Sequence, residues 1–272
     1  MIYRIRYIST FLLSAAYLWA AFEHPFLSPM NAGLGMSHIN FNRNILGSIM
    51  DPSSLAMGNR IRFAGQTGRR FNLKPLSHQS FVGGIPSRWG SFATGIQTFG
   101  IKQYKESTFS IAFGRQIKKG FNGGVAINAY SLSIPNYGSA STFGISLAWQ
   151  VNLNDNIQWG TILHNMNGPT IGKSEDSLPQ LILTALSFHP TKRISVQIEW
   201  EQDTVFEGQL KSGFSFQPKT WLTLHSGFVS GTGQVTGAIG VHFYKVNINY
   251  AMANHPHLGP SHWMGFTIPL GK

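Results

Sequence analysis

The chain has 272 residues, of which 42% are hydrophobic and only 11% are charged. A typical water-soluble domain has about 25% charged residues, so this composition argues against an ordinary soluble surface. Lys and Arg number 21 and Asp and Glu number 10, which gives a formal net charge of +11. The chain has no cysteine, so disulfide bonds contribute nothing to its fold.

Residues 1–21 have the features of a secretory signal peptide. Arg4 and Arg6 give a positive start, residues 8–18 form a short apolar core, and Ala20 and Ala21 supply small residues for cleavage. A transmembrane anchor is the alternative, but the apolar run is shorter than the roughly 20 residues that span a bilayer. Later residues contain no such run, so a membrane protein with this sequence must be a closed β-barrel.

Residues 22–58 form an irregular stretch that contains several prolines and glycines. Asp51 as N-cap and Pro52 in the first turn predict a short helix over residues 51–56. Its position between the signal peptide and the first strand predicts an N-terminal periplasmic or plug segment that lies in the mouth of a barrel. Asp51, Pro52 and Ser53 are therefore the candidate plug motif, with an ordinary capped turn as the alternative.

Residues 59–272 show the alternation expected of β-strands. Between 192 and 201, Ile194, Val196, Ile198 and Trp200 alternate with polar residues, which gives one apolar face and one polar face. Most segments are near the 9–11 residues that a tilted strand needs to cross a membrane. We expect an all-β fold, a transmembrane antiparallel β-barrel of about 14 strands. The expected strands lie at residues 59–66, 77–85, 89–99, 107–116, 121–133, 139–151, 156–165, 179–188, 192–201, 206–217, 220–229, 234–243, 245–254 and 261–270.

The connections between these segments are alternately tight and loose, and the longest covers residues 166–178. Short turns at one rim and longer loops at the other are typical of outer-membrane barrels, with the short turns in the periplasm. Much of the positive charge belongs to the tight turns, which argues against a nucleic-acid-binding stripe. The basic residues of these turns are Lys118, Lys119, Lys192, Arg193, Lys219 and Lys245.

Tryptophans are expected near both rims, as in the aromatic girdles of membrane barrels. The tight-turn set comprises Trp89, Trp149, Trp159 and Trp221, and the loop set comprises Trp200 and Trp263. The alternative fold is a soluble sandwich with buried tryptophans, but it would need more surface charge.

The run from Ala32-Gly33-Leu34-Gly35-Met36 to Asp51-Pro52-Ser53-Ser54-Leu55-Ala56, followed by basic turns such as Gln217-Pro218-Lys219-Thr220-Trp221, resembles the PorV/PorQ proteins among the FadL-like outer-membrane barrels. The family's Asn-Pro-Ala signature is replaced by Asp51-Pro52-Ser53, and the chain ends on Leu270-Gly271-Lys272 instead of an aromatic residue. The resemblance implies a fourteen-stranded barrel with an N-terminal plug in the outer membrane of a Gram-negative, Bacteroidota-like bacterium. Its surroundings would be outer-membrane lipid and lipopolysaccharide.

One group of polar residues is expected on the lumen face of the barrel. It comprises Glu199, Glu201, Lys211, Asn247 and Asn249. The simpler interpretation is a network that fills and rigidifies the barrel, and the sharper one is a substrate-selective lining.

The sequence predicts no catalytic site and no cofactor. The adjacent pairs His225-Ser226 and Ser261-His262 would face opposite sides of a strand, so neither forms a catalytic pair. His255, His257 and His262 are possible metal ligands in the last loop, but without a carboxylate or cysteine nearby a polar loop is the better interpretation.

Two functional classes follow. Similarity to PorV implies an accessory subunit of an outer-membrane secretion or assembly complex, with other outer-membrane proteins as partners. The FadL-like resemblance implies a passive channel for hydrophobic small molecules, which would need an apolar pocket above the plug and a side opening. The accessory role is slightly favoured, because the short loops leave little material for capturing a substrate.

Overall fold

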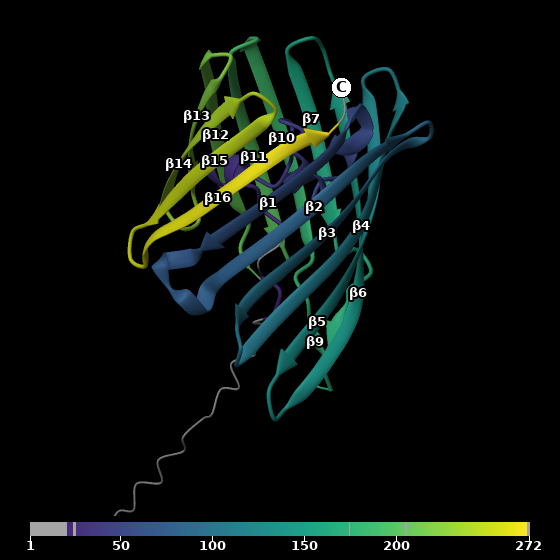
Figure 1. Ribbon diagram of the computed structural model, residues 1–272, viewed down its shortest axis with the longest axis vertical. Coiled ribbons are helices and arrows are strands. Elements are labelled where there is room, and N and C mark those ends of the chain that lie inside the picture. The colour runs from purple at the N-terminus through teal and green to yellow at the C-terminus, as the bar shows by residue number, and fades with distance from the viewer. Residues whose placement is uncertain (1–20, 24–25, 174, 205, 271–272) are drawn as a thin grey trace, which may run out of the picture.

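The computed structural model describes residues 21–23, 26–173, 175–204 and 206–270 (Figure 1). Except for Ala21, the predicted signal peptide lies outside the described residues. Among the described residues, no helix combines the length and the apolar character needed to cross a bilayer.

In this part of the chain, fourteen antiparallel strands close into a barrel in which β1 pairs with β16. The prediction of a β-barrel of about 14 strands is confirmed. The strands of the barrel wall are β1 (Ile61–Arg69), β2 (Ser77–Ser87), β3 (Gly90–Ile101), β4 (Tyr104–Lys118), β5 (Phe121–Ile134), β6 (Gly138–Asn152), β7 (Ile157–His164), β10 (Leu181–Thr191), β11 (Ile194–Asp203), β12 (Gln209–Lys219), β13 (Leu222–Val229), β14 (Gln234–Phe243), β15 (Val246–His255) and β16 (Gly259–Leu270).

The two rims of the barrel differ in their connections. At the turn rim, at the top of Figure 1, short turns join β2 to β3, β4 to β5, β6 to β7, β10 to β11, β12 to β13 and β14 to β15. The other connections form the loop rim, where the segment between β1 and β2 carries the 3₁₀ turns η3 (Arg70–Asn72) and η4 (Lys74–Leu76). The predicted loop 166–178 contains a small hairpin that the sequence analysis missed, formed by β8 (Thr170–Ile171) and β9 (Asp176–Ser177).

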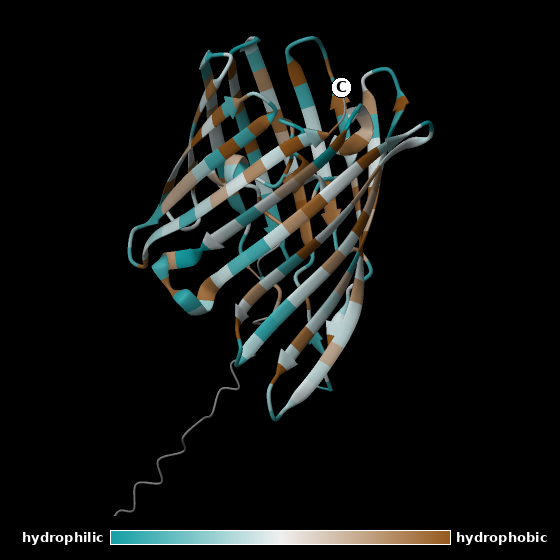
Figure 2. Cartoon of the chain, in the orientation of Figure 1, coloured by the Kyte–Doolittle hydropathy of each residue, from teal (hydrophilic) through white to brown (hydrophobic). Residues whose placement is uncertain are grey.

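Hydrophobic and hydrophilic residues alternate along the strands at the front of Figure 2. Most large apolar residues of the strands are exposed on the outer surface, and the strand residues buried in the lumen are mostly small or polar. Ile111, Ile127 and Ile145 lie side by side on β4, β5 and β6, and 53% of Ile127 is exposed on the outer surface. Its neighbours in sequence, Ala126 and Asn128, are buried in the lumen. This is the surface of a transmembrane barrel, whose outer band contacts acyl chains.

The segment from residue 26 to residue 58 lies inside the barrel as a plug. Its helix α1 (Pro29–Gly33) lies against β13–β16, the 3₁₀ turn η1 (Ile45–Ser48) against β1 and β2, and η2 (Pro52–Met57) against β3–β6. Wall glycines make room for this contact. A Cβ atom at Gly124 would lie 2.4 Å from the carbonyl carbon of Pro52, so only glycine allows η2 to approach β5 so closely.

The wall is incomplete next to β7, which is shorter than its neighbours. β6 pairs with β7 only over Leu147–Asn152, so among the described residues its loop-rim half has no strand partner on that side. The Asn167 side chain bridges the start of this gap by accepting from the N–H of Ile145 and donating to the carbonyl of Phe143. The chain then folds inward, where Ile171 and Leu178 pack against Phe22 and Tyr130.

The tryptophans fit the expected girdle with one exception. Trp89, Trp221 and Trp200 are exposed on the outside, and Trp149 and Trp159 form an edge-to-face pair with centroids 6.5 Å apart. Trp263 is only 2% exposed and faces the lumen. Its placement in the girdle was wrong, because the outward positions of β16 are taken by Met264 and Phe266, and adjacent residues face opposite sides.

Substitution of Ile127 tests the lipid-facing band. Arginine there must leave water for the acyl region, so Ile127→Arg should lower the free energy of unfolding in phospholipid vesicles by about 2–4 kcal/mol. Urea titration of tryptophan fluorescence measures this difference. Tyr137→Arg, in a 90% exposed position at the loop rim, is the control and should change it little. Equal effects of the two substitutions would contradict a lipid-facing β5.

Candidate functional site

The plug is held at its middle by one buried carboxylate, that of Glu199 on β11. Glu199 is 1% exposed and accepts hydrogen bonds from Ser37 Oγ at 2.6 Å, from the N–H of His38 at 3.0 Å and from the N–H of Ile39 at 2.9 Å. These plug amides have no strand partner, and buried N–H groups are costly when unpaired. Glu199 therefore satisfies the backbone of residues 37–39 and fixes the plug to the wall.

A buried ammonium group completes this cluster. Lys211 Nζ lies 2.5 Å from Glu201 Oε2, 3.1 Å from the carbonyl oxygen of Met36 and 3.8 Å from Glu199 Oε1. His38 Nδ1 lies 3.2 Å from Glu201 Oε2 and 3.4 Å from the same ammonium. Glu199 and Lys211 face each other in the β11–β12 register, and Glu201 is two residues further on the same face. The β11–β12 register therefore brings Glu199, Glu201 and Lys211 together, as predicted.

The other two residues of the expected network lie elsewhere. Asn247 and Asn249 face inward near the start of β15, at the turn rim, whereas Glu199 and Glu201 lie in the loop-rim half of β11. Asn247 Oδ1 pairs with His242 Nδ1 instead. Strand periodicity assigns a residue to the lumen but does not say how high along the barrel it lies.

The candidate plug motif is a second attachment point. Asp51 is fully buried and accepts from the N–H of Asn40 at 2.9 Å, from Gln150 Nε2 of β6 at 2.6 Å and from Ser53 Oγ at 2.5 Å. Burial raises the pKa of Asp51, and these hydrogen bonds act in the opposite direction. Pro52 begins η2, as expected, but the Asp51 side chain joins two parts of the plug to the wall and makes no capping bond to this helix.

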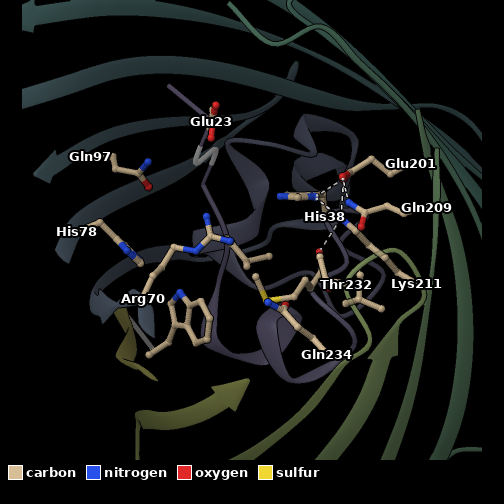
Figure 3. A pocket seen from close by; sticks show the side chains of 14 residues that line it. Glu23, His38, Arg70, His78, Gln97, Glu201, Gln209, Lys211, Thr232 and Gln234 are labelled. Atoms are coloured by element: carbon tan, nitrogen blue, oxygen red, sulfur yellow. Dashed lines mark hydrogen bonds and ion pairs between the residues drawn. The ribbon is translucent and has the colours of Figure 1, made fainter. Parts of the chain in front are cut away.

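Between the plug and the loop rim lies a cavity of about 180 Å³ (Figure 3). In Figure 3, Arg70, His78 and Gln97 face the group of His38 and Glu201 across this cavity. An apolar side is also present. It is formed by Leu27, Met36, Val229 and Trp263. A lining of this kind suits a small molecule with an apolar body and a polar group.

Two charged residues from separate segments meet at this cavity. Glu23 belongs to the N-terminal segment and Arg70 to η3. Burial raises the pKa of Glu23, and the positive charge of Arg70 partly offsets that effect. Burial lowers the pKa of Arg70, with Glu23 acting in the opposite direction. Glu23 and Arg70 thus each favour the charged form of the other.

A third polar cluster, which was not predicted from the sequence, lies on β5–β7. Tyr130 Oη donates to Asn165 Oδ1 at 2.8 Å, and Ser146 Oγ lies 3.0 Å from His164 Nδ1. Each residue looks like an isolated polar position on its own strand. Only the strand register, which was not available from the sequence, brings them together.

The histidines considered as catalytic residues or metal ligands do not come together in one site. His225 is buried with both ring nitrogens unpartnered, and no bond joins it to Ser226 among the described residues. His255 Nδ1 accepts turn N–H groups, whereas His262 Nδ1 lies 2.8 Å from Tyr250 Oη. Close potential metal ligands occur instead at His38, Glu199 and Glu201, whose ligand atoms lie within 4.8 Å of one another. Lys211 already places a positive charge there.

No protein-family model matches the chain, and no curated protein matches it. Several solved structures do. The toluene transporter TbuX of Ralstonia pickettii has a TM-score of 0.69 at 9% identity, covering 90% of this chain and 98% of that chain. The toluene transporter TodX of P. putida has a TM-score of 0.66 at 10% identity, covering 84% and 95%.

A FadL homologue of Pseudomonas aeruginosa has a TM-score of 0.63 at 8% identity, covering 90% of this chain and 97% of that chain. Identities this low establish the fold and nothing finer. They give no specific support to a PorV/PorQ assignment. The chain has the fold of the FadL-type barrels.

Glu199→Ala should loosen the plug. The substitution leaves three plug donors without their acceptor and removes one of the two carboxylates beside Lys211, at a cost of roughly 3–5 kcal/mol. Hydrogen–deuterium exchange of residues 37–39 should become much faster, while the amides of β4 and β5 stay protected. Asn249→Ala is the control, because Asn249 lies outside this cluster. Unchanged exchange at 37–39 in Glu199→Ala would show that the carboxylate does not hold the plug.

Lys211→Ala should expose a latent cation site. Removing the ammonium leaves His38, Glu199 and Glu201 without a compensating charge, and imidazole with carboxylates suits Zn²⁺. Zn²⁺ should therefore raise the Tm of Lys211→Ala but not that of the wild type. Double substitution with His38→Ala should reduce the shift. A wild-type Tm that rises equally with Zn²⁺ would contradict the assignment of Lys211 as the resident cation.

Proposed function

We propose that the protein is an outer-membrane channel for small amphipathic molecules in a Gram-negative bacterium. The observation that carries this proposal is a mixed polar and apolar cavity enclosed between a fastened plug and the loop rim of a closed barrel. The fold shared with two toluene transporters supports it. The Bacteroidota-like source is an expectation from the PorV/PorQ resemblance alone. No catalytic role is part of the proposal.

A second cavity extends the entry region. It measures about 350 Å³, lies next to η4 and the β3–β4 turn, and shares Glu23 with the first. Its apolar lining is formed by Pro75, Leu76, Phe99 and Ile101, with Tyr104 and Glu106 beside them. A ligand with an apolar body would enter here and place its polar group against the residues of the first cavity.

Beyond this point the plug obstructs the lumen, so passage requires movement of the plug or an exit through the wall. The gap beside the loop-rim half of β6 offers the side opening that the channel hypothesis needs. It is closed by Asn167 and by the packing of Ile171 and Leu178, without a continuous strand ladder. Side-chain packing opens at lower cost than a hydrogen-bonded wall.

The accessory role is the second candidate, with other outer-membrane proteins as partners. The same loop-rim half of β6 favours it, because an unpaired strand edge is a template for adding a strand from another chain. The comparisons with solved structures fit the channel better than this role.

Uptake of a small aromatic alcohol into proteoliposomes tests the channel. Thr232 is exposed, lines the cavity and lies at the loop rim, so Thr232→Trp should fill the cavity mouth and abolish most of the uptake. Leu258→Trp, at the same rim but outside the cavity, is the control and should transport like the wild type. Uptake no faster than in protein-free liposomes would overturn the channel proposal.

Co-purification of other membrane proteins that is lost in Ser141→Pro, on the β6 edge, would support the accessory role.

A further inference from the structure

We propose that a third pocket, on the turn-rim side of the plug, binds a small oxyanion such as a carboxylate or a phosphate. The pocket measures about 310 Å³ and lies between plug residues 42–45 and strands β1 and β13–β16. The described residues that line it include two arginines and a histidine but no Asp or Glu. This site is separate from the loop-side cavity, and the inference does not depend on transport.

The two arginines approach the pocket from different parts of the molecule. Arg43 belongs to the plug and Arg62 to β1, and both are half-buried. Arg62 Nη1 donates to the carbonyl oxygen of Arg43 at 3.0 Å. A guanidinium has five N–H donors, so this bond uses only a fraction of the available capacity.

Neither arginine forms an ion pair with a carboxylate among the described residues. Burial lowers the pKa of Arg43, and no nearby acid in the described structure offsets it. Half-buried guanidinium groups that lack an acidic partner leave positive charge uncompensated. An oxyanion in the pocket would supply the missing charge and match the planar donor geometry of both groups.

A buried hydroxyl gives independent support. Thr267 on β16 is only 8% exposed, lines this pocket, and its Oγ1 has no hydrogen-bond partner in the described structure. Buried polar atoms in folded proteins are almost always paired, so this hydroxyl indicates a missing ligand atom or a bound water. Asn249 and the pair of His242 and Asn247 add further polar groups around it.

The position of the pocket indicates a soluble ligand. Asn249 and Thr267 face the lumen, and both are buried away from the lipid-facing surface. An oxyanion held by both arginines would connect the plug to β1 on its turn-rim side, apart from the Glu199 contact. Binding is thus expected to stabilise the seated plug.

Isothermal titration of the purified full-length protein in detergent, with inorganic phosphate and with succinate as probes, tests this inference. We expect one site per chain for each probe. Arg43→Gln and Arg62→Gln should each weaken binding roughly tenfold or more, because each removes a charge-assisted bond. Thr267→Val should weaken it about fivefold. Arg193→Gln, an equal charge change in an exposed turn of the same rim, should bind like the wild type.

Heat-modifiable migration in SDS gels shows whether each variant has folded. If an arginine variant does not fold, Thr267→Val still tests the oxyanion site. A short-chain phosphatidylglycerol distinguishes a lipid headgroup from a free anion. Binding of this lipid without binding of phosphate or succinate would overturn the proposal, as would absence of any binding. Equal affinity of the wild type, Arg43→Gln and Thr267→Val would also overturn it. None of these readouts requires transport, so failure here leaves the channel proposal intact.

Discussion

The structure depends on one requirement, which is that the backbone polar groups of the plug find partners inside the barrel. A strand satisfies its N–H and C=O groups through its neighbours, but an irregular segment in a closed lumen cannot. Wall side chains provide the missing bonds. Glu199 accepts from residues 37–39, Thr236 bonds to the carbonyl oxygen of Gly33 and to the N–H of Gly35, and Gln66 donates to the carbonyl oxygen of Leu27.

This requirement explains the unusual interior. Small inward residues such as Gly124 leave room for the plug, and buried charges such as Lys211 and Glu199 hold it in place. Buried ion pairs contribute little net stability, but removing one partner is costly. The network therefore acts mainly to specify one position of the plug. The cavities on the loop-rim side and the pocket on the turn-rim side of the plug follow from that position, and their chemistry differs because different wall strands line them.

Much of this fold was predictable, because a two-residue period and regularly spaced turns are local properties of the sequence. The apolar outward face of Val196, Ile198 and Trp200 was assigned correctly, and so was the short helix after Asp51. Height along the barrel was not predictable, because it depends on register and shear, which involve many strands. Asn247 and Asn249 were thus grouped with Glu199 although they lie at the other rim. The plug contacts of Asp51 and Glu199 were also missed, since nothing local in the sequence relates residue 38 to residue 199.

The location of the plug is the central claim, and thiol labelling tests it most directly. The chain has no native cysteine, so single-cysteine variants report one position each. Ser48 is 1% exposed within the plug, and Tyr137 is 90% exposed at the loop rim. A membrane-impermeant maleimide should label Tyr137→Cys rapidly in intact membranes and label Ser48→Cys only after unfolding. Labelling of Ser48→Cys at a rate similar to that of Tyr137→Cys would contradict a plug seated in the lumen.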